Sequence, residues 1–492
     1  MKLLQLLVVA LSLGGAVSGS AQRVFIEPSD ALESQGRFKD AATALTNALA
    51  DKSLAASPRK QLEFELDRLD RIRKDYRLTQ AALFEELKQS VKDVTAEEFE
   101  RWIAEGRFDT REIDGEQRFM VSSVSNLFFR YAELESRRIK PKTPATHEQA
   151  VLAACQSIQQ AARAEGRPYV LPKRFRATMT VTAKADAAPE GETIRAWLPI
   201  PRHYPFQKDF EVVSSQPHTQ EINSYERVIR AACLEKTARK GKPTEFKIEY
   251  SYTSYGVKFE VQPETVRACD ANDAGLAPFL REGPHIEFTP EIRALSREII
   301  GAETNCFRKA KQCFDWIADQ IKYSYATEYS TIRNLSEYCR TKGYGDCGQE
   351  ALLFITLCRL NGVPARWQSG WNTFPGGKDI HDWTEIYLAP YGWMPVDPYM
   401  GIWAMRYTRT LTPPQQREIR DFYFGGLDQW RMIANGDHCQ ALSPPKKSLR
   451  SDNVDFQRGE LEWGNHNIYF DQYNYDLQVK EVKLPKQEAH VE

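Results

Sequence analysis

The sequence has almost no net charge and, outside its N-terminus, no long hydrophobic run. It contains 66 Lys and Arg against 67 Asp and Glu in 492 residues, a formal charge of -1. Without a basic excess there is no long-range field to attract nucleic acid, so we expect no nucleic-acid partner. No later stretch approaches the roughly 18 apolar residues of a membrane-spanning helix, so we expect no integral membrane segment in the mature chain.

Cysteine pairs and metal-binding spacings are also scarce. The chain has nine cysteines but no Cys-x-x-Cys pair, so disulfides are not the framework of this fold. His438-Cys439 stands alone without a second pair at zinc spacing. The segment Asp452–Asp455 lacks the Gly and final Glu of a calcium loop. We therefore predict neither a metal ion nor any other cofactor.

The N-terminus does carry a recognisable pattern. Lys2 precedes an apolar run, Leu3 to Leu13, that only Gln5 and Ser12 interrupt, and Ser18-Gly-Ser-Ala21 offers small residues for cleavage. The run is too short to span the ~30 Å of a bilayer as a mature helix. We predict that residues 1–21 form a signal peptide and that the mature protein is exported, to the periplasm or out of the cell.

The periodicity of the remaining chain predicts a multidomain α+β protein. Residues 22–168 place apolar residues at helical spacing among many charges, which predicts a helical N-terminal region. Residues 169–268 alternate polar and apolar side chains between Pro and Gly turns, which predicts a β-rich, sandwich-like domain. Residues 275–410 mix both periods and predict an α+β catalytic core. Residues 411–492 are polar and turn-rich, and we assign them to a C-terminal extension.

Cys347 lies where a thiol can become reactive. The motif Gly343-Tyr-Gly-Asp-Cys-Gly-Gln349 directly precedes an apolar helix predicted over residues 347–360, and Asn361-Gly362 ends that helix. A helix N-terminus carries partial positive charge, so we expect the pKa of Cys347 to lie below its free value of about 8.5. The flanking glycines let the backbone approach a substrate, and the Cys347 N–H could bind an oxyanion.

A base and a group to orient it lie on a predicted hairpin. His381 begins an alternating run to Leu388, and residues 393–397 read as the partner strand, ending at Asp397. Folding the hairpin about its turn brings His381 and Asp397 to its open end, on strands ~5 Å apart, in a register that depends on the loop length. Together with Cys347 they predict a catalytic triad of nucleophile, base and orienting acid.

These motifs resemble the transglutaminase-like superfamily, a circularly rearranged relative of the papain-type cysteine proteases. The residues that carry the resemblance are Gly345-Asp346-Cys347, Gly362-Val-Pro-Ala-Arg366, Gly370-Trp371, His381-x-Trp383-x-Glu385 and Gly392-Trp393-x-x-x-Asp397-Pro398. The resemblance implies a papain-like α+β core with Cys347, His381 and Asp397 as its triad, in an exported bacterial protein. The chain departs from the family at Asp382, where Ala is common. We expect Asp382 to face away from His381 and to add negative charge nearby.

The resemblance implies acyl transfer from peptide-like amides. Water as the acceptor makes the protein a peptidase or amidase that acts on a peptide or protein, with cell-wall peptide among the options, and this is our first hypothesis. A lysine amine as the acceptor makes it a cross-linking transglutaminase, and a vestigial triad makes it a binding or scaffold protein. The second oxyanion donor stays open, with Tyr344 as one candidate. We expect Trp371, Trp383 and Trp393 to belong to the core, and Trp371 is the best candidate among them for the alternative, a place at a substrate cleft.

Overall fold

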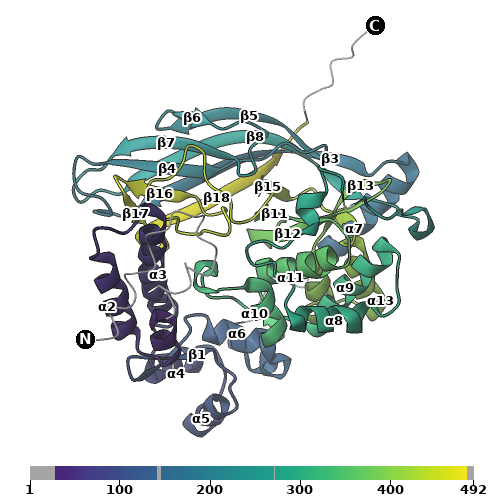
Figure 1. The fold of residues 1–492 in the computed structure, drawn as a ribbon. Helices are drawn as coiled ribbons and strands as arrows, with labels where there is room; N and C mark the ends of the chain where they lie inside the picture. The colour runs from purple at the N-terminus through teal and green to yellow at the C-terminus, as the bar shows by residue number, and fades with distance from the viewer. Residues whose placement is uncertain (1–27, 141–145, 271, 485–492) are drawn as a thin grey trace. The chain divides into compact units, whose positions relative to one another are not determined.

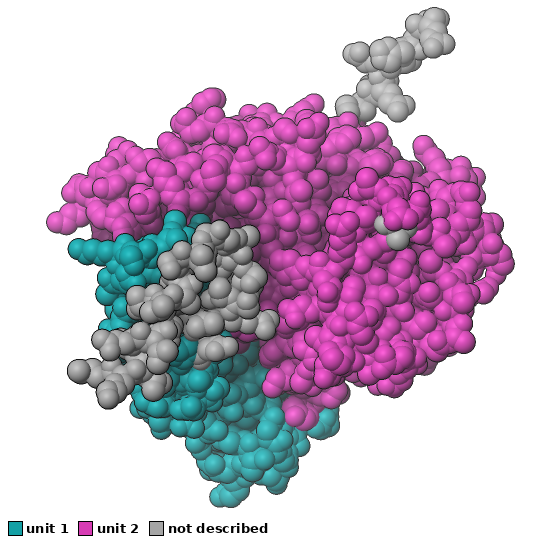
Figure 2. All heavy atoms as spheres, viewed as in Figure 1, with its two compact units in different colours: residues 1–128, 133–139 teal, residues 129–132, 140–492 magenta. Residues whose placement is uncertain are grey.

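The computed structural model describes residues 28–140, 146–270 and 272–484 (Figure 1). They divide into two compact units, which Figure 2 colours separately. The first unit extends to residue 128 and includes 133–139, and the second contains 129–132 and the chain from residue 140 onward. The region predicted as helical, 22–168, contributes to both units, because helix α7 (Thr146–Glu165) belongs to the second.

The first unit consists of helices and one small hairpin. Its elements are α2 (Phe38–Leu49), α3 (Ala56–Asp75), α4 (Gln80–Lys88), α5 (Ala96–Ala104), β1 (Thr110–Ile113), β2 (Glu116–Phe119), most of α6 (Ser123–Arg130) and most of η2 (Ala132–Arg137). Thr95 caps α5 by accepting the Glu98 N–H at 3.2 Å. Asp114 and Gly115, with φ of 52° and 84°, form the turn between β1 and β2.

Two five-stranded sheets form the β-sandwich-like part of the second unit. The strands are β3 (Tyr169–Ala183), β4 (Thr193–Pro199), β5 (Gln207–Gln216), β6 (Glu221–Ile222), β7 (Ala231–Thr237), β8 (Thr244–Lys258), β14 (Gly426–Leu427), β16 (Glu460–Trp463), β17 (His466–Ile468) and β18 (Tyr473–Val482). One sheet has the order β14-β8-β3-β18 with β5 beside β8, and the other has the order β17-β16-β4-β7-β6. The segment predicted as a C-terminal extension therefore supplies strands to both sheets, while the domain boundaries stay predictions.

The rest of the second unit is a four-stranded antiparallel sheet, β13-β12-β11-β15, with helices packed against it. Its strands are β11 (Ala365–Asn372), β12 (Asp379–Leu388), β13 (Gly392–Val396) and β15 (Arg431–Asn435). The helices and short elements are η3 (Pro263–Thr265), η4 (Ala277–Leu280), α8 (Pro290–Ile300), α9 (Cys306–Gln320), β9 (Lys322–Tyr323), η5 (Tyr329–Thr331), α10 (Leu335–Lys342), β10 (Tyr344–Gly345), α11 (Cys347–Leu360), α12 (Pro398–Arg406), α13 (Pro413–Phe422) and, between β17 and β18, η6 (Phe470–Gln472).

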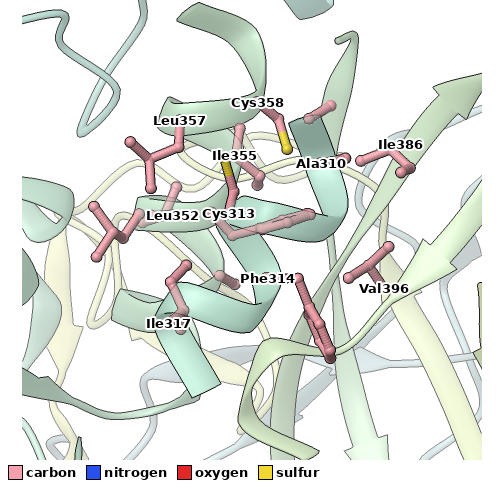
Figure 3. Packing of buried hydrophobic residues seen from close by; sticks show 14 of the residues in the cluster. Ala310, Cys313, Phe314, Ile317, Leu352, Ile355, Leu357, Cys358, Ile386 and Val396 are labelled. Atoms are coloured by element: carbon pink, nitrogen blue, oxygen red, sulfur yellow. The ribbon is translucent and has the colours of Figure 1, made fainter. Parts of the chain in front are cut away.

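Helix α11 is the central helix of this part of the unit. All its residues from Gly348 to Arg359 are buried. Its apolar side chains pack against α9 and against the sheet, as Figure 3 shows for Cys313, Phe314, Ile317, Leu352, Ile355, Cys358, Ile386 and Val396. Because a helix buried on all sides cannot shift without opening the core, its N-terminus at Cys347 is held in a fixed position.

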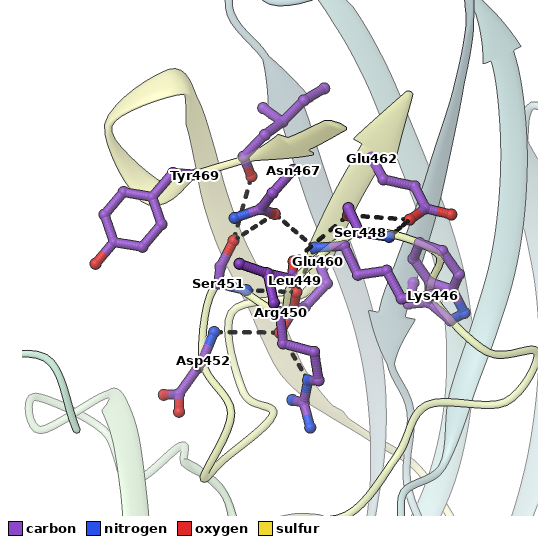
Figure 4. A network of polar contacts seen from close by, with 12 residues as sticks. Lys446, Ser448, Leu449, Arg450, Ser451, Asp452, Glu460, Glu462, Asn467 and Tyr469 are labelled. Carbon is purple, nitrogen blue, oxygen red and sulfur yellow. Dashed lines mark hydrogen bonds and ion pairs between the residues drawn. The ribbon is translucent and has the colours of Figure 1, made fainter. Parts of the chain in front are cut away.

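The C-terminal segment between β15 and β17 is held by buried ion pairs (Figure 4). Glu460 accepts from Lys446 Nζ at 2.7 Å and from Arg450 Nε at 2.9 Å, and the side chains of Lys446 and Glu460 are almost completely buried. Burial alone would raise the pKa of Glu460, but these two cations outweigh burial and hold that pKa below its usual value. The pairs fix the loop that precedes β16.

Within the described ranges, no helix combines the length and the hydropathy that a membrane span requires. The predicted signal peptide, residues 1–21, lies outside those ranges. In the same part of the chain no three His, Cys, Asp or Glu side chains are grouped so as to hold a metal ion. All nine cysteines are free thiols.

Candidate active site

Cys347 is the first residue of α11, as the sequence predicts. Asp346 caps the helix through a capping box, in which its carboxylate accepts the Gln349 N–H and the Gln349 side chain accepts the Asp346 N–H. The preceding helix α10 ends at Gly343, whose φ of 67° reverses the chain. The short parallel pair β10–β9 then leads the chain to Cys347, whose side chain is half-buried.

His381 and Asp397 meet at the open end of the β12–β13 hairpin. The register pairs Thr384 with Val396, the last residue of β13, and Asp397 follows directly and caps helix α12. His381 Nε2 lies 2.8 Å from Asp397 Oδ2, and both side chains are buried. The structure thus brings into direct contact two residues that the hairpin prediction placed only at the same open end.

Arg431 completes this part of the site from strand β15. Its Nη1 forms an ion pair with Asp397 Oδ2 at 3.0 Å, and Asp397 Oδ1 accepts the Met400 N–H at 3.1 Å. Burial alone would raise the pKa of Asp397, but His381 and Arg431 outweigh it and lower that pKa below its usual value. Asp397 is therefore an ionised acceptor that fixes the orientation of His381.

Two further residues hold His381 in place. The Tyr399 ring meets the imidazole edge-on, with ring centroids 5.2 Å apart. Gln457 donates its side-chain N–H to the His381 carbonyl at 2.8 Å. Neither residue was predicted from the sequence. Gln457 lies 76 residues from His381 in a polar loop, and no local sequence rule links the two. Tyr399 lies two residues after Asp397 and could have been considered as a neighbour of His381.

The Cys347 thiol contacts Asp382. Cys347 Sγ lies 3.5 Å from Asp382 Oδ2, and Asp382 is buried. No hydrogen bond joins Cys347 to His381 in the described part of the chain. The structure thus pairs His381 with Asp397 and directs the thiol towards Asp382. Catalytic hydrogen bonds often tighten only when substrate binds, so this geometry does not remove His381 as a candidate base.

The predicted lowering of the Cys347 pKa is wrong for this structure. Burial raises the pKa of Cys347 well above its ordinary value, and the nearby carboxyls of Asp382 and Asp346 raise it further. These effects outweigh the helix N-terminus, because desolvation and like charges both disfavour the thiolate. The Cys347 side chain is therefore a neutral thiol at neutral pH.

Tyr329 packs closely against the start of α11. Its hydroxyl lies 2.7 Å from Asp346 Oδ1 and 3.2 Å from Asp382 Oδ2, and it accepts the Gly348 N–H at 3.1 Å. A Cβ atom at position 348 would lie 2.1 Å from the Tyr329 hydroxyl and 2.7 Å from Asp382 Oδ2. Only glycine fits at this position.

The structure also shows the contacts of Trp371 and Tyr344, the two aromatic residues considered for the cleft and for the oxyanion site. Trp371 is 4% exposed, packs in the sandwich core and donates its indole N–H to the Gln457 carbonyl at 3.0 Å, so its expected place in the core is confirmed. The Tyr344 ring lies beneath the Arg130 guanidinium, 3.7 Å from ring centroid to carbon. The oxyanion role considered for Tyr344 stays a prediction.

Comparison with known proteins supports the resemblance. Residues 293–398 match the model of the transglutaminase-like superfamily, and this segment contains Cys347, His381 and Asp397. An uncharacterized protein of Haemophilus influenzae is 23% identical over 278 residues, which are 50% of this chain and 74% of the relative. The uncharacterized protein YebA of Bacillus subtilis is 28% identical over 130 residues, 22% of this chain and 17% of that protein.

Comparison with solved structures gave matches of low sequence identity. A candidate cysteine protease from Cytophaga hutchinsonii is 17% identical, with a TM-score of 0.42, over 64% of this chain and 93% of that chain. The periplasmic domain of TgpA from Pseudomonas aeruginosa is 14% identical, with a TM-score of 0.27, over 54% of this chain and 95% of that chain. The predicted fold class, a multidomain α+β protein with a transglutaminase-like core, is confirmed.

Proposed function

We propose that the protein is an exported cysteine hydrolase of transglutaminase-like type, a peptidase or amidase with Cys347, His381 and Asp397 as its triad. One observation carries the proposal: the ionised Asp397, held by Arg431, orients His381 inside the segment that matches the family model. The same segment fixes Cys347 at the N-terminus of a buried helix. Export rests on the predicted signal peptide at residues 1–21.

In the proposed acylation step, His381 acts as a general base. Its Nε2 faces Asp397, which leaves Nδ1 to accept the proton of the Cys347 thiol as the sulfur attacks an amide carbonyl. The Cys347 N–H stabilises the oxyanion that forms. His381 then returns the proton to the leaving amine, the C–N bond breaks, and a thioester on Cys347 remains.

Deacylation reverses the proton transfers. Water gives a proton to His381 as its oxygen attacks the thioester, the C–S bond breaks, and the carboxylic acid and the free thiol are released. A lysine amine in place of water would give an isopeptide bond, which is the cross-linking alternative. We favour water because the described site offers no feature dedicated to a protein lysine. The substrate we propose is a peptide or protein, with cell-wall peptide as one source.

Alkylation mapping by mass spectrometry tests the nucleophile and its base. We expect Cys347 to label faster than Cys269 and Cys439, the other half-buried thiols, because His381 accepts its proton as the sulfur reacts, and to label more slowly in a His381→Ala variant. Labelling of Cys347 at the same rate as those two thiols would contradict the proposal.

Hydrolysis assays on peptide and cell-wall fragments test the reaction. Cys347→Ala should lower hydrolysis by a factor on the order of 10³ or more, whereas Cys439→Ala, a matched thiol outside the site, should leave it unchanged. Incorporation of an added amine without hydrolysis would favour the cross-linking transglutaminase. Binding of the same fragments without turnover, retained in Cys347→Ala, would favour the scaffold alternative.

A further inference from the structure

Asp382 contacts the candidate nucleophile from the strand that carries the candidate base. Its Oδ2 lies 3.5 Å from Cys347 Sγ and 3.2 Å from the Tyr329 hydroxyl. Its Oδ1 accepts the Gln457 side-chain N–H at 2.7 Å, and the residue is 2% exposed. Each oxygen of this carboxyl therefore has a partner, and one of them is the reactive sulfur.

Few groups around Asp382 would balance a negative charge. The titratable groups that face it come from the start of α11, from η5 and from the loop before β16, and they are Cys347, Asp346, Tyr329 and Asp455. The Cys347 thiol also interacts electrostatically with Glu350, Tyr323, Tyr325, Tyr329 and Tyr399. Two cations act on the neighbouring carboxyls: Arg458 lowers the pKa of Asp346, and Arg450 lowers that of Asp455.

We propose that Asp382 is a positioning residue that controls when the Cys347 thiol can ionise, because the two groups touch and compete for a single negative charge. This inference rests on the proposed role of Cys347 as nucleophile. Two acids in contact lose their protons in two steps, and the first loss suppresses the second. If Asp382 loses its proton first, the Cys347 thiolate forms only in the second deprotonation, against the charge of Asp382. While Asp382 keeps its proton, the thiolate can form in the first deprotonation.

Asp455 affects the pH at which Asp382 ionises. Its buried carboxylate accepts hydrogen bonds from Ser369 and Asn435, and Asp382 interacts with it directly. Burial raises the pKa of Asp382 well above its usual value, and Asp455 and Asp346 raise it further. Asp455 thereby delays the ionisation of Asp382, but Asp382 still ionises before Cys347, whose pKa the Asp382 charge raises.

The C-terminal segment holds these partners in place. Asp455 and Gln457 lie in the loop before β16. The buried ion pairs of Glu460 with Lys446 and Arg450 fix this loop (Figure 4). Gln457 contacts both the His381 carbonyl and the Asp382 carboxyl. A segment far from the nucleophile in the sequence therefore contributes to the surroundings of the thiol.

The test is the pH dependence of Cys347 alkylation in the full chain, followed by mass spectrometry. Asp382→Asn keeps the shape of the side chain and removes its charge, so the thiol should ionise alone. We expect its labelling midpoint to move down by about one pH unit or more, with labelling at pH 7 faster by roughly tenfold. Asp379→Asn, an exposed carboxyl on the same strand, serves as the matched control and should stay within about twofold of the parent rate.

Asp455→Asn provides a second variant with the opposite expectation. Loss of this neighbour lets Asp382 ionise at lower pH, so Cys347 should label at the parent rate or more slowly. Parent-like labelling in Asp382→Asn, or faster labelling in a folded Asp455→Asn, would overturn the inference. If Asp382→Asn does not fold, Asp455→Asn decides alone. The His381→Ala result is independent, so failure of the proposed base and failure of this inference can be told apart.

Discussion

At the scale of single residues, the site depends on close contacts that leave no spare volume. Gly348, the residue after the candidate nucleophile, faces the Tyr329 hydroxyl and the Asp382 carboxyl. The backbone N–H of Gly348 also donates to the same hydroxyl at 3.1 Å. The spacing between helix α11 and these two side chains is therefore set by the absence of a side chain at position 348.

Gly348→Ala should destabilise the protein and disturb the thiol. The added methyl cannot be accommodated unless Tyr329 or Asp382 moves, and such overpacking costs about 1–3 kcal/mol. Thermal unfolding and Cys347 alkylation should both change. Gly283→Ala is the control, because an added Cβ there has open space around it. An unchanged melting temperature in Gly348→Ala would show that the start of α11 adjusts freely.

Asp397→Asn should abolish activity without unfolding the protein. The amide keeps the volume but cannot accept from both His381 and Arg431 as an ionised carboxylate does. We expect hydrolysis to fall by a factor on the order of 10²–10⁴, because His381 loses its fixed tautomer. Circular dichroism gives the folding control. Retained hydrolysis would remove Asp397 from the triad.

At the scale of elements, the parts that local rules control could be predicted from the sequence. Helix α11 was predicted over the residues it occupies, because a Gly- and Asp-containing cap precedes it and Asn361-Gly362 ends it. Hairpin folding placed His381 and Asp397 at the same open end, but the direct contact between their side chains could not be predicted, because it depends on a register that the sequence left open.

Other parts of the site depend on contacts that the sequence does not encode locally. Asp382 and Gln457 are 75 residues apart, and no spacing rule joins them. The raised pKa of Cys347 follows from tertiary burial, which the helix-terminus argument omits. Lys446 and Glu460 lie in a polar segment, and nothing in that sequence pattern indicates that the fold buries both side chains.

The loop before β16 gives a pH prediction at this scale. The folded pKa of Glu460 lies below its unfolded value of about 4.3, so its contribution to stability is present above that pH and is lost as pH falls through the folded pKa. Glu460→Gln should therefore lower the free energy of unfolding at pH 7, by about 3–5 kcal/mol because Lys446 stays buried without its partner. It should also flatten the pH dependence of stability below about pH 5.

Urea unfolding at several pH values measures this effect. Glu481→Gln, which removes an exposed partner of Lys173, is the control and should change stability by less than about 1 kcal/mol. If the two substitutions lower the free energy of unfolding equally, the buried ion pair stabilises the protein no more than the exposed one.

At the scale of the whole molecule, the second unit is closed by its C-terminal strand. Strand β18 pairs with β3 over ten residues, from Tyr473–Ala183 to Val482–Arg174. Tyr473 and Leu477 are buried in the sandwich core. The edge of one sheet and part of its core thus depend on a segment about 300 residues away from its partner.

A chain that ends after Gln472 should lose soluble, uniformly folded protein. Without β18 the backbone of β3 has an open edge and the sandwich core loses two large side chains. Size-exclusion chromatography and thermal unfolding measure the outcome. A chain that ends after Leu484 keeps all of β18 and should behave like the parent protein. Parent-like melting of the shorter chain would show that the strand is dispensable.

The pairing of β18 with β3 also determines when the unit can finish folding during synthesis. Strand β3 leaves the ribosome long before β18, and loop closure over so many residues is slow. A nascent chain therefore carries an incomplete sheet until residue 482 has emerged. The sandwich of a protein that we propose to be exported is therefore completed only after nearly the whole polypeptide has been made.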